Sequence, residues 1–299
     1  MRLEFPKFLF LITALLSAIT STNAFAIPTL AKPELWNTHS FETLSDTTYN
    51  FDGIIEIRSI FGGCSASLVR FDFSKDSDKA IVLTNGHCLE GGMPGANTFV
   101  FNKNSNRKFN VLDPKTANVL GRIEAEKIMY GTMTGTDLAL YKLTTTYKDI
   151  QSKFGVNALT LDRGLSPVGE KIEIISGYWK RGFSCEIELV VPTLKEGEWT
   201  MNNSIRYSRP GCEVYGGTSG SPILRAGTRT VVGINNTGNE SGEKCTLNNP
   251  CEVDESGNIT AVKGYGYGQQ IKNIYNCLNN LLEIDLSLST CNLYGGSVQ

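Results

Sequence analysis

Most of the chain after residue 50 alternates between short apolar runs and clusters of turn residues. The runs are rich in Val, Ile, Leu and aromatic side chains, and Gly, Asn, Asp and Ser are frequent between them. Short strands bounded by turn residues, with few helical patterns, are typical of an all-β barrel or sandwich. The pattern predicts strands at 53–60, 65–73, 80–85, 97–102, 137–143, 171–179, 185–191 and 230–236.

Two segments depart from this pattern. The segment 147–166 is polar at its start and separates two strand-rich halves of similar length, so we interpret it as a linker. Near the C-terminus, the segment 269–282 predicts an amphipathic helix that packs against the strands. Its apolar side chains recur at steps of three and four residues: Ile271, Ile274, Tyr275, Leu278, Leu281 and Leu282.

The N-terminus has the order of a secretory signal. Arg2 and Lys7 mark a charged start, an apolar run follows at 8–19, and a small-x-small motif ends at Ala26. A membrane anchor is the alternative, but the apolar run is short for a bilayer span. We therefore expect a signal peptide at 1–26 and a secreted protein, extracellular or periplasmic. The segment 27–50 is then an N-terminal segment and a candidate pro-segment.

Composition limits the classes of function. With 40% hydrophobic residues and a formal net charge of −2 over 299 residues, the chain is expected to be globular. It has no basic run with interleaved aromatic residues, which argues against nucleic acid as a partner. After the N-terminal run, no stretch is long and apolar enough to span a bilayer, so we expect no membrane contact once the signal is removed.

The chain contains eight cysteines and two histidines. An even number of cysteines in an exported protein predicts four disulfides, whose pairing the sequence alone leaves open. Metal binding is the alternative, but no CxxC motif occurs and the histidines are only His39 and His87. We therefore expect no metal and no cofactor, and we interpret His39 as structural or solvent-exposed. The cysteines are Cys64, Cys88, Cys185, Cys212, Cys245, Cys251, Cys277 and Cys291.

The stretch GGTSGSPIL at 216–224 places two serines among glycines, directly before an apolar run. Gly and Ser are ordinary turn residues, so this stretch alone indicates a loop between strands. A serine nucleophile needs a base and a third group that orients the base. His87 follows an apolar run in IVLTNGHC, and Asp137 begins one in TDLALYKL. With Ser219, they give the order His, Asp, Ser that is found in chymotrypsin.

Together with GGCSASLV at 62–69, these motifs resemble the trypsin/chymotrypsin-like serine endopeptidases. The GTSGSP form of the serine motif is similar to that of the secreted bacterial branch that includes the glutamyl endopeptidases. In LTNGHC, Asn85 and Gly86 stand where the animal enzymes usually have two alanines. The resemblance covers about 51–282. It implies two six-stranded antiparallel β-barrels with a C-terminal helix: a first barrel at 51–146, the linker at 147–166, a second barrel at 167–268, and the helix and tail at 269–299.

The resemblance implies a role for each member of the triad. Ser219 is expected to be the nucleophile, His87 the base that accepts its proton, and Asp137 the group that orients the imidazole. By family position, the N–H groups of Gly217 and Ser219 are the oxyanion donors. Ser221 is the rival nucleophile, but the family places the attacking serine directly before the glycine that is Gly220 here, so Ser219 is favoured.

Thr218 departs from the zymogen-type trypsins. In those enzymes an aspartate at this position pairs with the N-terminal amine that activation releases, and Thr218 has no charge for such a pair. We infer that this chain does not mature through that ion pair.

The resemblance also implies a disulfide between Cys64 and Cys88, which would fasten the loop of His87 to the first barrel. For the other cysteines we propose the pairs Cys185–Cys212, Cys245–Cys251 and Cys277–Cys291. The last pair would tie the C-terminal tail to the helix.

The substrate pocket is inferred by family position. The residue six before the nucleophile is Glu213, where a carboxylate at the base of the pocket favours Lys or Arg at P1, the residue before the cleaved bond. A surface position for Glu213 is the alternative, and Tyr215 could fill the pocket instead. The pocket wall is expected from 232–238, including Gly238. Asn235 stands where the glutamyl endopeptidases have a histidine, so cleavage after Glu is not expected.

The sequence therefore predicts a secreted serine endopeptidase that hydrolyses peptide bonds through an acyl-enzyme intermediate. Protein or peptide substrates are the expected partners, and we expect a monomer. Two alternatives stay open: a catalytically silent binding or adhesion protein on the same fold, and an esterase that uses the same triad. The α/β-hydrolase elbow is not matched, because its triad has the order Ser, Asp, His.

Overall fold

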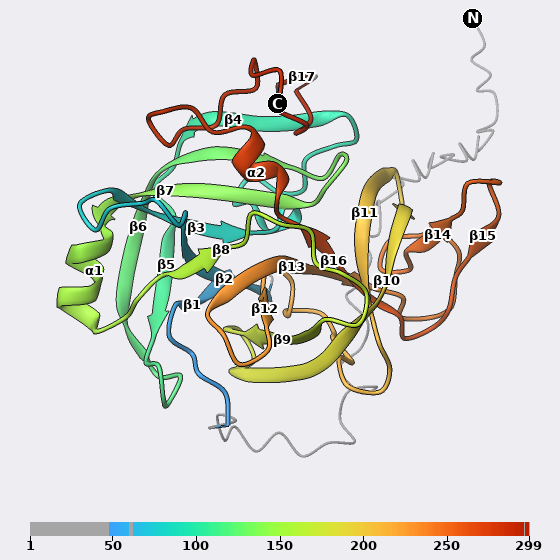
Figure 1. Ribbon diagram of the computed structural model, residues 1–299, viewed down its shortest axis with the longest axis horizontal. Helices are drawn as coiled ribbons and strands as arrows, with labels where there is room; N and C mark the ends of the chain where they lie inside the picture. Colours follow the sequence, from blue (N-terminus) through green and yellow to red (C-terminus); the bar gives the residue numbers. More distant parts are fainter. Residues whose placement is uncertain (1–47, 60–61, 296, 299) are drawn as a thin grey trace, which may run out of the picture. The chain divides into compact units, whose positions relative to one another are not determined.

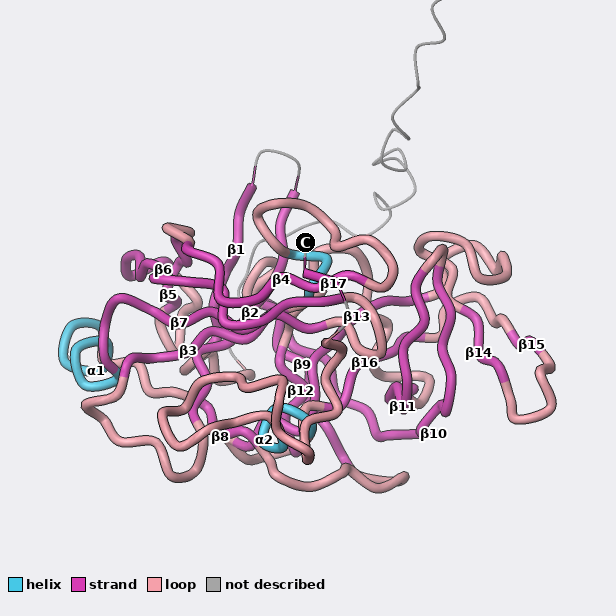
Figure 2. The backbone as a smooth tube through the Cα atoms, turned by 90° about the horizontal axis from the view of Figure 1, so that it is seen from above, coloured by secondary structure: helices cyan, strands magenta, loops and turns pink. Residues whose placement is uncertain are grey.

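The computed structural model describes residues 48–59, 62–295 and 297–298. Strands form nearly all of the regular structure, and the helices are short (Figure 2). None of the helices in the described part of the chain is long and apolar enough to cross a membrane. The predicted signal peptide at 1–26, most of the segment 27–50 and His39 lie outside the described residues.

The first barrel is closed by six antiparallel strands. Each strand pairs with the next in the order β1–β2–β3–β7–β6–β5, and β5 pairs with β1 again. Their buried aliphatic and aromatic side chains, such as Ile55, Leu68, Phe109 and Tyr141, fill the interior. A seventh strand, β4 (Thr98–Asn104), pairs with the long β6. The barrel strands are β1 (Ile54–Ser59), β2 (Gly62–Arg70), β3 (Lys79–Thr84), β5 (Lys108–Leu112), β6 (Val119–Thr132) and β7 (Leu138–Thr146).

The second barrel repeats this closure. Its order is β9–β10–β11–β16–β13–β12, and β12 pairs with β9. The short strands β14 (Cys251–Val253) and β15 (Ile259–Thr260) extend the sheet from β10. The prediction of two six-stranded antiparallel barrels is therefore confirmed. The barrel strands are β9 (Lys171–Ser176), β10 (Arg181–Glu196), β11 (Trp199–Tyr207), β12 (Pro222–Arg225), β13 (Thr230–Gly238) and β16 (Gly266–Gln270).

The segment between the barrels is more ordered than a polar linker. It begins with helix α1 (Tyr147–Phe154), whose first turn is capped reciprocally by Thr146 and Asp149 and which ends at Gly155 in the left-handed conformation. Strand β8 (Leu159–Leu161) follows and pairs in parallel with both β2 and β13. Because β2 and β13 belong to different barrels, β8 connects the two (Figure 1).

The predicted C-terminal helix is present but much shorter than 269–282. Gln269 and Gln270 belong to β16, and helix α2 (Asn273–Asn276) is a single turn. After Cys277 the chain turns back, with a bridge between Leu278 and Ile284. Of the apolar side chains that predict the helix, Ile271, just before α2, and Ile274, within α2, are buried in the core. The tail then lies beside β4, where β17 (Ser297–Val298) pairs with Thr98 and Phe99 (Figure 1).

Four disulfides are present: Cys64–Cys88, Cys185–Cys212, Cys245–Cys251 and Cys277–Cys291. They are the same pairs that the sequence analysis proposes. No cysteine in the described residues is free. The last disulfide joins the residue after α2 to the tail.

Candidate active site

His87 and Asp137 lie together because their strands are neighbours. His87 lies in the 3-10 turn η2 (Gly86–Cys88) directly after β3, and Asp137 directly precedes β7, which pairs with β3. His87 Nδ1 is 2.6 Å from Asp137 Oδ2, and the His87 backbone N–H donates to Asp137 Oδ1 at 3.1 Å. Asp137 is only 1% exposed. The carboxylate therefore fixes both the ring and the backbone of the histidine.

The Asn85-Gly86 pair has a local structural explanation. A Cβ on Gly86 would lie 2.0 Å from the Thr132 carbonyl oxygen, which no real side chain tolerates. Asn85 Nδ2 donates to the Asp137 carbonyl at 2.8 Å and so holds the backbone of the aspartate. These two residues therefore allow the turn of His87 to approach β6 and the Asp137 loop closely.

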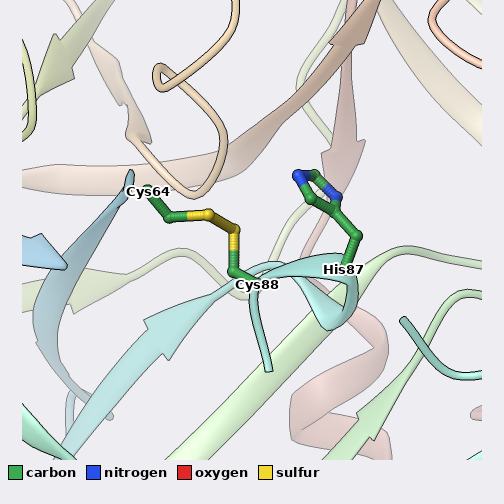
Figure 3. Close-up of side chains that lie close together, drawn as sticks. All are labelled: Cys64, His87 and Cys88. Carbon is green, nitrogen blue, oxygen red and sulfur yellow. A yellow bond between two sulfur atoms is a disulfide. The ribbon is translucent and has the colours of Figure 1, made fainter. Parts of the chain in front are cut away.

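The Cys64–Cys88 disulfide lies next to His87 (Figure 3). It joins β2 to the turn that carries the histidine and so restricts the movement of that turn. The two sulfur atoms and a ring nitrogen of His87 lie within 4.8 Å of one another, an arrangement that resembles a metal site. Both sulfur atoms are in the disulfide, so neither is a thiolate that could bind a metal.

The electrostatic environment of His87 favours its protonated form. Burial lowers the pKa of His87, whereas the charge of Asp137 and the hydrogen bond to it raise the pKa, and the net change is upward. A histidine that is more basic than usual, with one nitrogen held by a carboxylate, is suited to accept a proton at its other nitrogen.

Ser219 lies on a tight loop of the second barrel that contacts the first. Its hydroxyl donates to the Asn236 carbonyl at 3.3 Å, and in the described residues it makes no hydrogen bond to His87. The Ser65 backbone N–H, from β2, donates to the Ser219 carbonyl at 2.7 Å. Gly220 has a φ of +82°, and a Cβ there would lie 2.1 Å from the Ser65 carbonyl. Glycine at 220 therefore permits the contact between the barrels.

A buried polar network supports this loop from behind. Asn235 Nδ2 donates to the Thr218 carbonyl at 2.9 Å, and Tyr207 Oη donates to Asn235 Oδ1 at 3.0 Å. Ser221 is 0% exposed, and its hydroxyl donates to the same Thr218 carbonyl at 2.6 Å. The hydrogen-bond partners of Thr218 are therefore uncharged. Asn235, which is buried, supports the loop from behind.

The backbone N–H groups of Gly217 and Ser219 are the expected oxyanion donors. In the described part of the chain, the N–H groups of Gly217 and Ser219 donate to no acceptor of the protein. The adjacent carbonyls are held, because Trp179 Nε1 donates to Gly216 O at 2.8 Å and Ser65 Oγ donates to Gly217 O at 3.2 Å. Two such N–H groups beside a serine can donate hydrogen bonds to a negatively charged oxygen.

The residues expected to form the substrate pocket have different surroundings. Glu213 is exposed, and its carboxylate accepts the Gly211 backbone N–H at 3.1 Å. Gly238 is paired with Gly266 across the two strands β13 and β16. Tyr215 packs against Trp179, with ring centroids 5.4 Å apart. The sequence analysis assigned no role to Ser65, which lies in the GGCSASLV motif, or to Tyr207, which lies in none, because each acts only through contacts formed by folding.

Two closed six-stranded barrels, with His87 and Asp137 on loops of the first and Ser219 on a loop of the second, are typical of the trypsin-like fold. A family model described as a trypsin-like peptidase domain matches residues 66–234, and the chain belongs to that family. A comparison with curated proteins finds no sequence match.

Solved structures that match this chain are distant in sequence. The MamO protease domain from Magnetospirillum magneticum has 16% identity and a TM-score of 0.46, over 80% of this chain and 100% of that chain. The Nocardiopsis protease has 16% identity and a TM-score of 0.43, over 75% and 94%. A Glu endopeptidase has 16% identity and a TM-score of 0.41, over 74% and 85%.

Proposed function

We propose that this trypsin-like peptidase is an active, secreted serine endopeptidase with His87 as base, Asp137 as its orienting group and Ser219 as nucleophile. The observation that carries the proposal is the 2.6 Å contact between His87 Nδ1 and buried Asp137. A carboxylate in that place fixes the tautomer in which the other ring nitrogen is free to accept a proton.

In the proposed reaction, the Ser219 hydroxyl turns from the Asn236 carbonyl to His87 Nε2. His87 accepts the proton as Ser219 Oγ attacks the substrate carbonyl, and Asp137 stabilises the imidazolium that forms. The carbonyl oxygen becomes negatively charged and binds the N–H groups of Gly217 and Ser219. His87 then protonates the leaving amine, and water hydrolyses the acyl-enzyme by the reverse sequence of proton transfers.

Export is part of the proposal. The signal-like order of residues 1–26 and the four disulfides both fit an oxidising compartment outside the cytosol. N-terminal sequencing of the protein recovered outside the cytosol is expected to begin at Ile27 or, if a pro-segment is removed, further along. Recovery only inside the cell with an intact N-terminus would contradict export.

A fluorophosphonate probe separates an active hydrolase from a silent binding protein. The probe is expected to label the purified chain, and peptide mapping is expected to place the label on Ser219 and not on Ser221. Failure of the folded chain to react would favour the silent binding protein. A peptide library assayed beside a simple ester then separates an endopeptidase from an esterase, since an esterase would cleave only the ester.

A further inference from the structure

The peptide bond between Gly216 and Gly217 carries one of the expected oxyanion donors, the N–H of Gly217. A trans peptide directs its carbonyl and its N–H to opposite sides, so the direction of the Gly216 carbonyl fixes that of the Gly217 N–H. Both residues are glycines, which tolerate the dihedral angles of either orientation of this peptide, and Gly217 has a φ of +90°. The loop backbone alone therefore does not select the orientation, and a contact from outside the loop is needed.

Trp179 supplies such a contact. Its indole Nε1–H donates to the Gly216 carbonyl at 2.8 Å. A Cβ on Gly217 would lie 2.7 Å from Trp179 Nε1 and 2.7 Å from a ring carbon of Tyr178. Glycine at 217 therefore does more than permit the turn, because it lets two aromatic side chains lie directly against the peptide.

The turn that carries Trp179 joins β9 to β10 and is held by the first barrel. The Trp179 backbone N–H donates to Ser176 Oγ at 3.2 Å, and Ser176 Oγ lies 2.9 Å from Ser65 Oγ of β2. A Cβ on Gly177 would lie 2.2 Å from the Ile55 carbonyl, so the turn also packs closely on β1. The first barrel thus sets the position of the indole, whereas the peptide that the indole contacts belongs to the second barrel.

Neighbouring rings fix the orientation of the indole. Tyr178 lies edge-on to Trp179, with ring centroids 5.0 Å apart and planes at 82°. Tyr215 lies 5.4 Å away with planes at 63°, and it belongs to the same loop as Ser219. Edge-to-face packing of this kind is a favoured arrangement of aromatic pairs. The indole therefore has defined neighbours on both sides of its hydrogen bond.

We propose that Trp179 is a positioning residue, whose indole N–H holds the Gly216–Gly217 peptide in the orientation that directs the Gly217 N–H toward the substrate oxygen. The inference rests on the proposed function, because that oxygen becomes negatively charged only if Ser219 attacks. Trp179 does not touch the reacting atoms and acts through the peptide. Without its hydrogen bond, the peptide between the two glycines has a second orientation, in which the carbonyl replaces the N–H and one oxyanion donor is lost.

The first test is the crystal structure of Trp179→Phe in the Ser219→Ala background, which does not depend on turnover. Phenylalanine removes the indole N–H and keeps an aromatic ring beside Tyr178 and Tyr215. We expect the Gly216 carbonyl to be reversed or to occupy two orientations. A single parental orientation in this variant would overturn the proposal.

Trp199→Phe is the matched control. Trp199 Nε1 also donates to a backbone carbonyl, that of Pro94, at 2.8 Å, outside the Ser219 loop. We expect the Gly216 carbonyl to keep its parental orientation, and its reversal in this variant would overturn the proposal. If Trp179→Phe fails to fold, Trp179 is replaced by benzothienylalanine, which keeps the two fused rings and has sulfur in place of the N–H. The expected and the contradicting orientations are the same.

The second test measures kcat and KM with Ser219 intact. Loss of a complete oxyanion donor lowers kcat about 10²- to 10³-fold. We expect Trp179→Phe to lower kcat about 10- to 100-fold at a nearly unchanged KM, because only part of the molecules lose the donor and the donor acts mainly in the transition state. Trp199→Phe is expected to keep the parental kcat. An equal loss of kcat in both variants, or a change in KM alone, would overturn the proposal.

The two tests separate this inference from the proposed function. If Ser219 is not the nucleophile, the fluorophosphonate probe does not label it, whereas the crystal structures still report the orientation of the peptide. If the probe labels Ser219 and Trp179→Phe keeps the parental kcat although its peptide reverses, the role of Trp179 is overturned and the proposed function stands.

Discussion

The two barrels hold their parts of the candidate site by different means. In the first barrel, a side chain fixes a side chain: buried Asp137 contacts His87 at 2.6 Å and also accepts its backbone N–H. In the second barrel, Ser219 is placed by its backbone. Its carbonyl accepts the Ser65 N–H, and the residue before it is supported by Asn235 and Ser221.

This difference separates residues that are expected to take part in the reaction from residues that hold the Ser219 loop in place. In the proposed mechanism, replacing a member of the His87–Asp137 pair changes proton transfer directly, because those side chains are expected to carry the proton and its counter-charge. In the second barrel, most contacts around Ser219 hold the loop without taking part in bond changes. We therefore expect substitutions in the first barrel pair to reduce turnover at nearly full stability, and substitutions in the support of the loop to reduce both.

Ser219→Ala is expected to have the largest effect. Loss of the nucleophile should reduce kcat on the order of 10⁶-fold, as removal of the serine does in subtilisin. Ser221→Ala is the matched control: the hydroxyl is buried and donates to a carbonyl that keeps other partners, so we expect only a small loss of turnover and a loss of about 1 kcal/mol of stability. Comparable turnover in Ser219→Ala and the parent chain would exclude Ser219 as the nucleophile.

Asp137→Asn is expected to come next, with a loss on the order of 10⁴ in kcat. The carboxamide keeps the shape of the side chain but favours the wrong tautomer of His87. Steady-state kinetics of the folded variant measure the effect, and urea denaturation should show nearly parental stability. A loss of less than tenfold would mean that the contact between His87 and Asp137 does not control the tautomer.

Asn235→Ala tests the second barrel alone. The variant removes the donor to Thr218 and leaves the buried Tyr207 hydroxyl without its acceptor, so the free energy of unfolding should fall by about 1–3 kcal/mol. Turnover should also fall, but less than in Asp137→Asn, since Ser221 still holds Thr218. Asn258→Ala, an exposed site between β14 and β15, is the control. Parental stability in Asn235→Ala would argue against the supporting network.

The sequence predicts the repeating parts of this architecture well, because strand alternation and turn residues are local signals. Strands β1, β3 and β13 coincide closely with predicted runs. Helix α1 was not predicted, although the Thr146 and Asp149 capping pair before Gly155 is a readable start and stop signal. The long helix at 269–282 was predicted wrongly, since apolar spacing does not distinguish a long helix from a single helical turn followed by a reversal of the chain. Leu281, which belongs to the predicted apolar face, is 75% exposed.

The candidate site divides in the same way. His87, Asp137 and Ser219 belong to short motifs, so their types and order can be recognised in one chain. Ser65 lies in the GGCSASLV motif and Tyr207 in none, but the contributions of both depend on contacts between residues far apart in the sequence, which no local pattern marks. Asn235 stays a prediction for the pocket wall, and its hydrogen bond to Thr218 also places it behind the loop of Ser219.

Glu213 is expected to give the smallest effect. The prediction of Lys or Arg at P1 depends on a carboxylate that is exposed and already accepts the Gly211 N–H. An exposed ion pair contributes about 0–1 kcal/mol, so Glu213→Gln should lower cleavage after Arg relative to Phe by less than about fivefold. A fluorogenic series with Arg, Lys, Phe, Leu, Ala and Glu at P1 measures the ratio in both chains. A much larger change would require Glu213 to be desolvated by the substrate, whereas preference for Phe or Ala over Arg in the parent chain would mean that the carboxylate does not face P1.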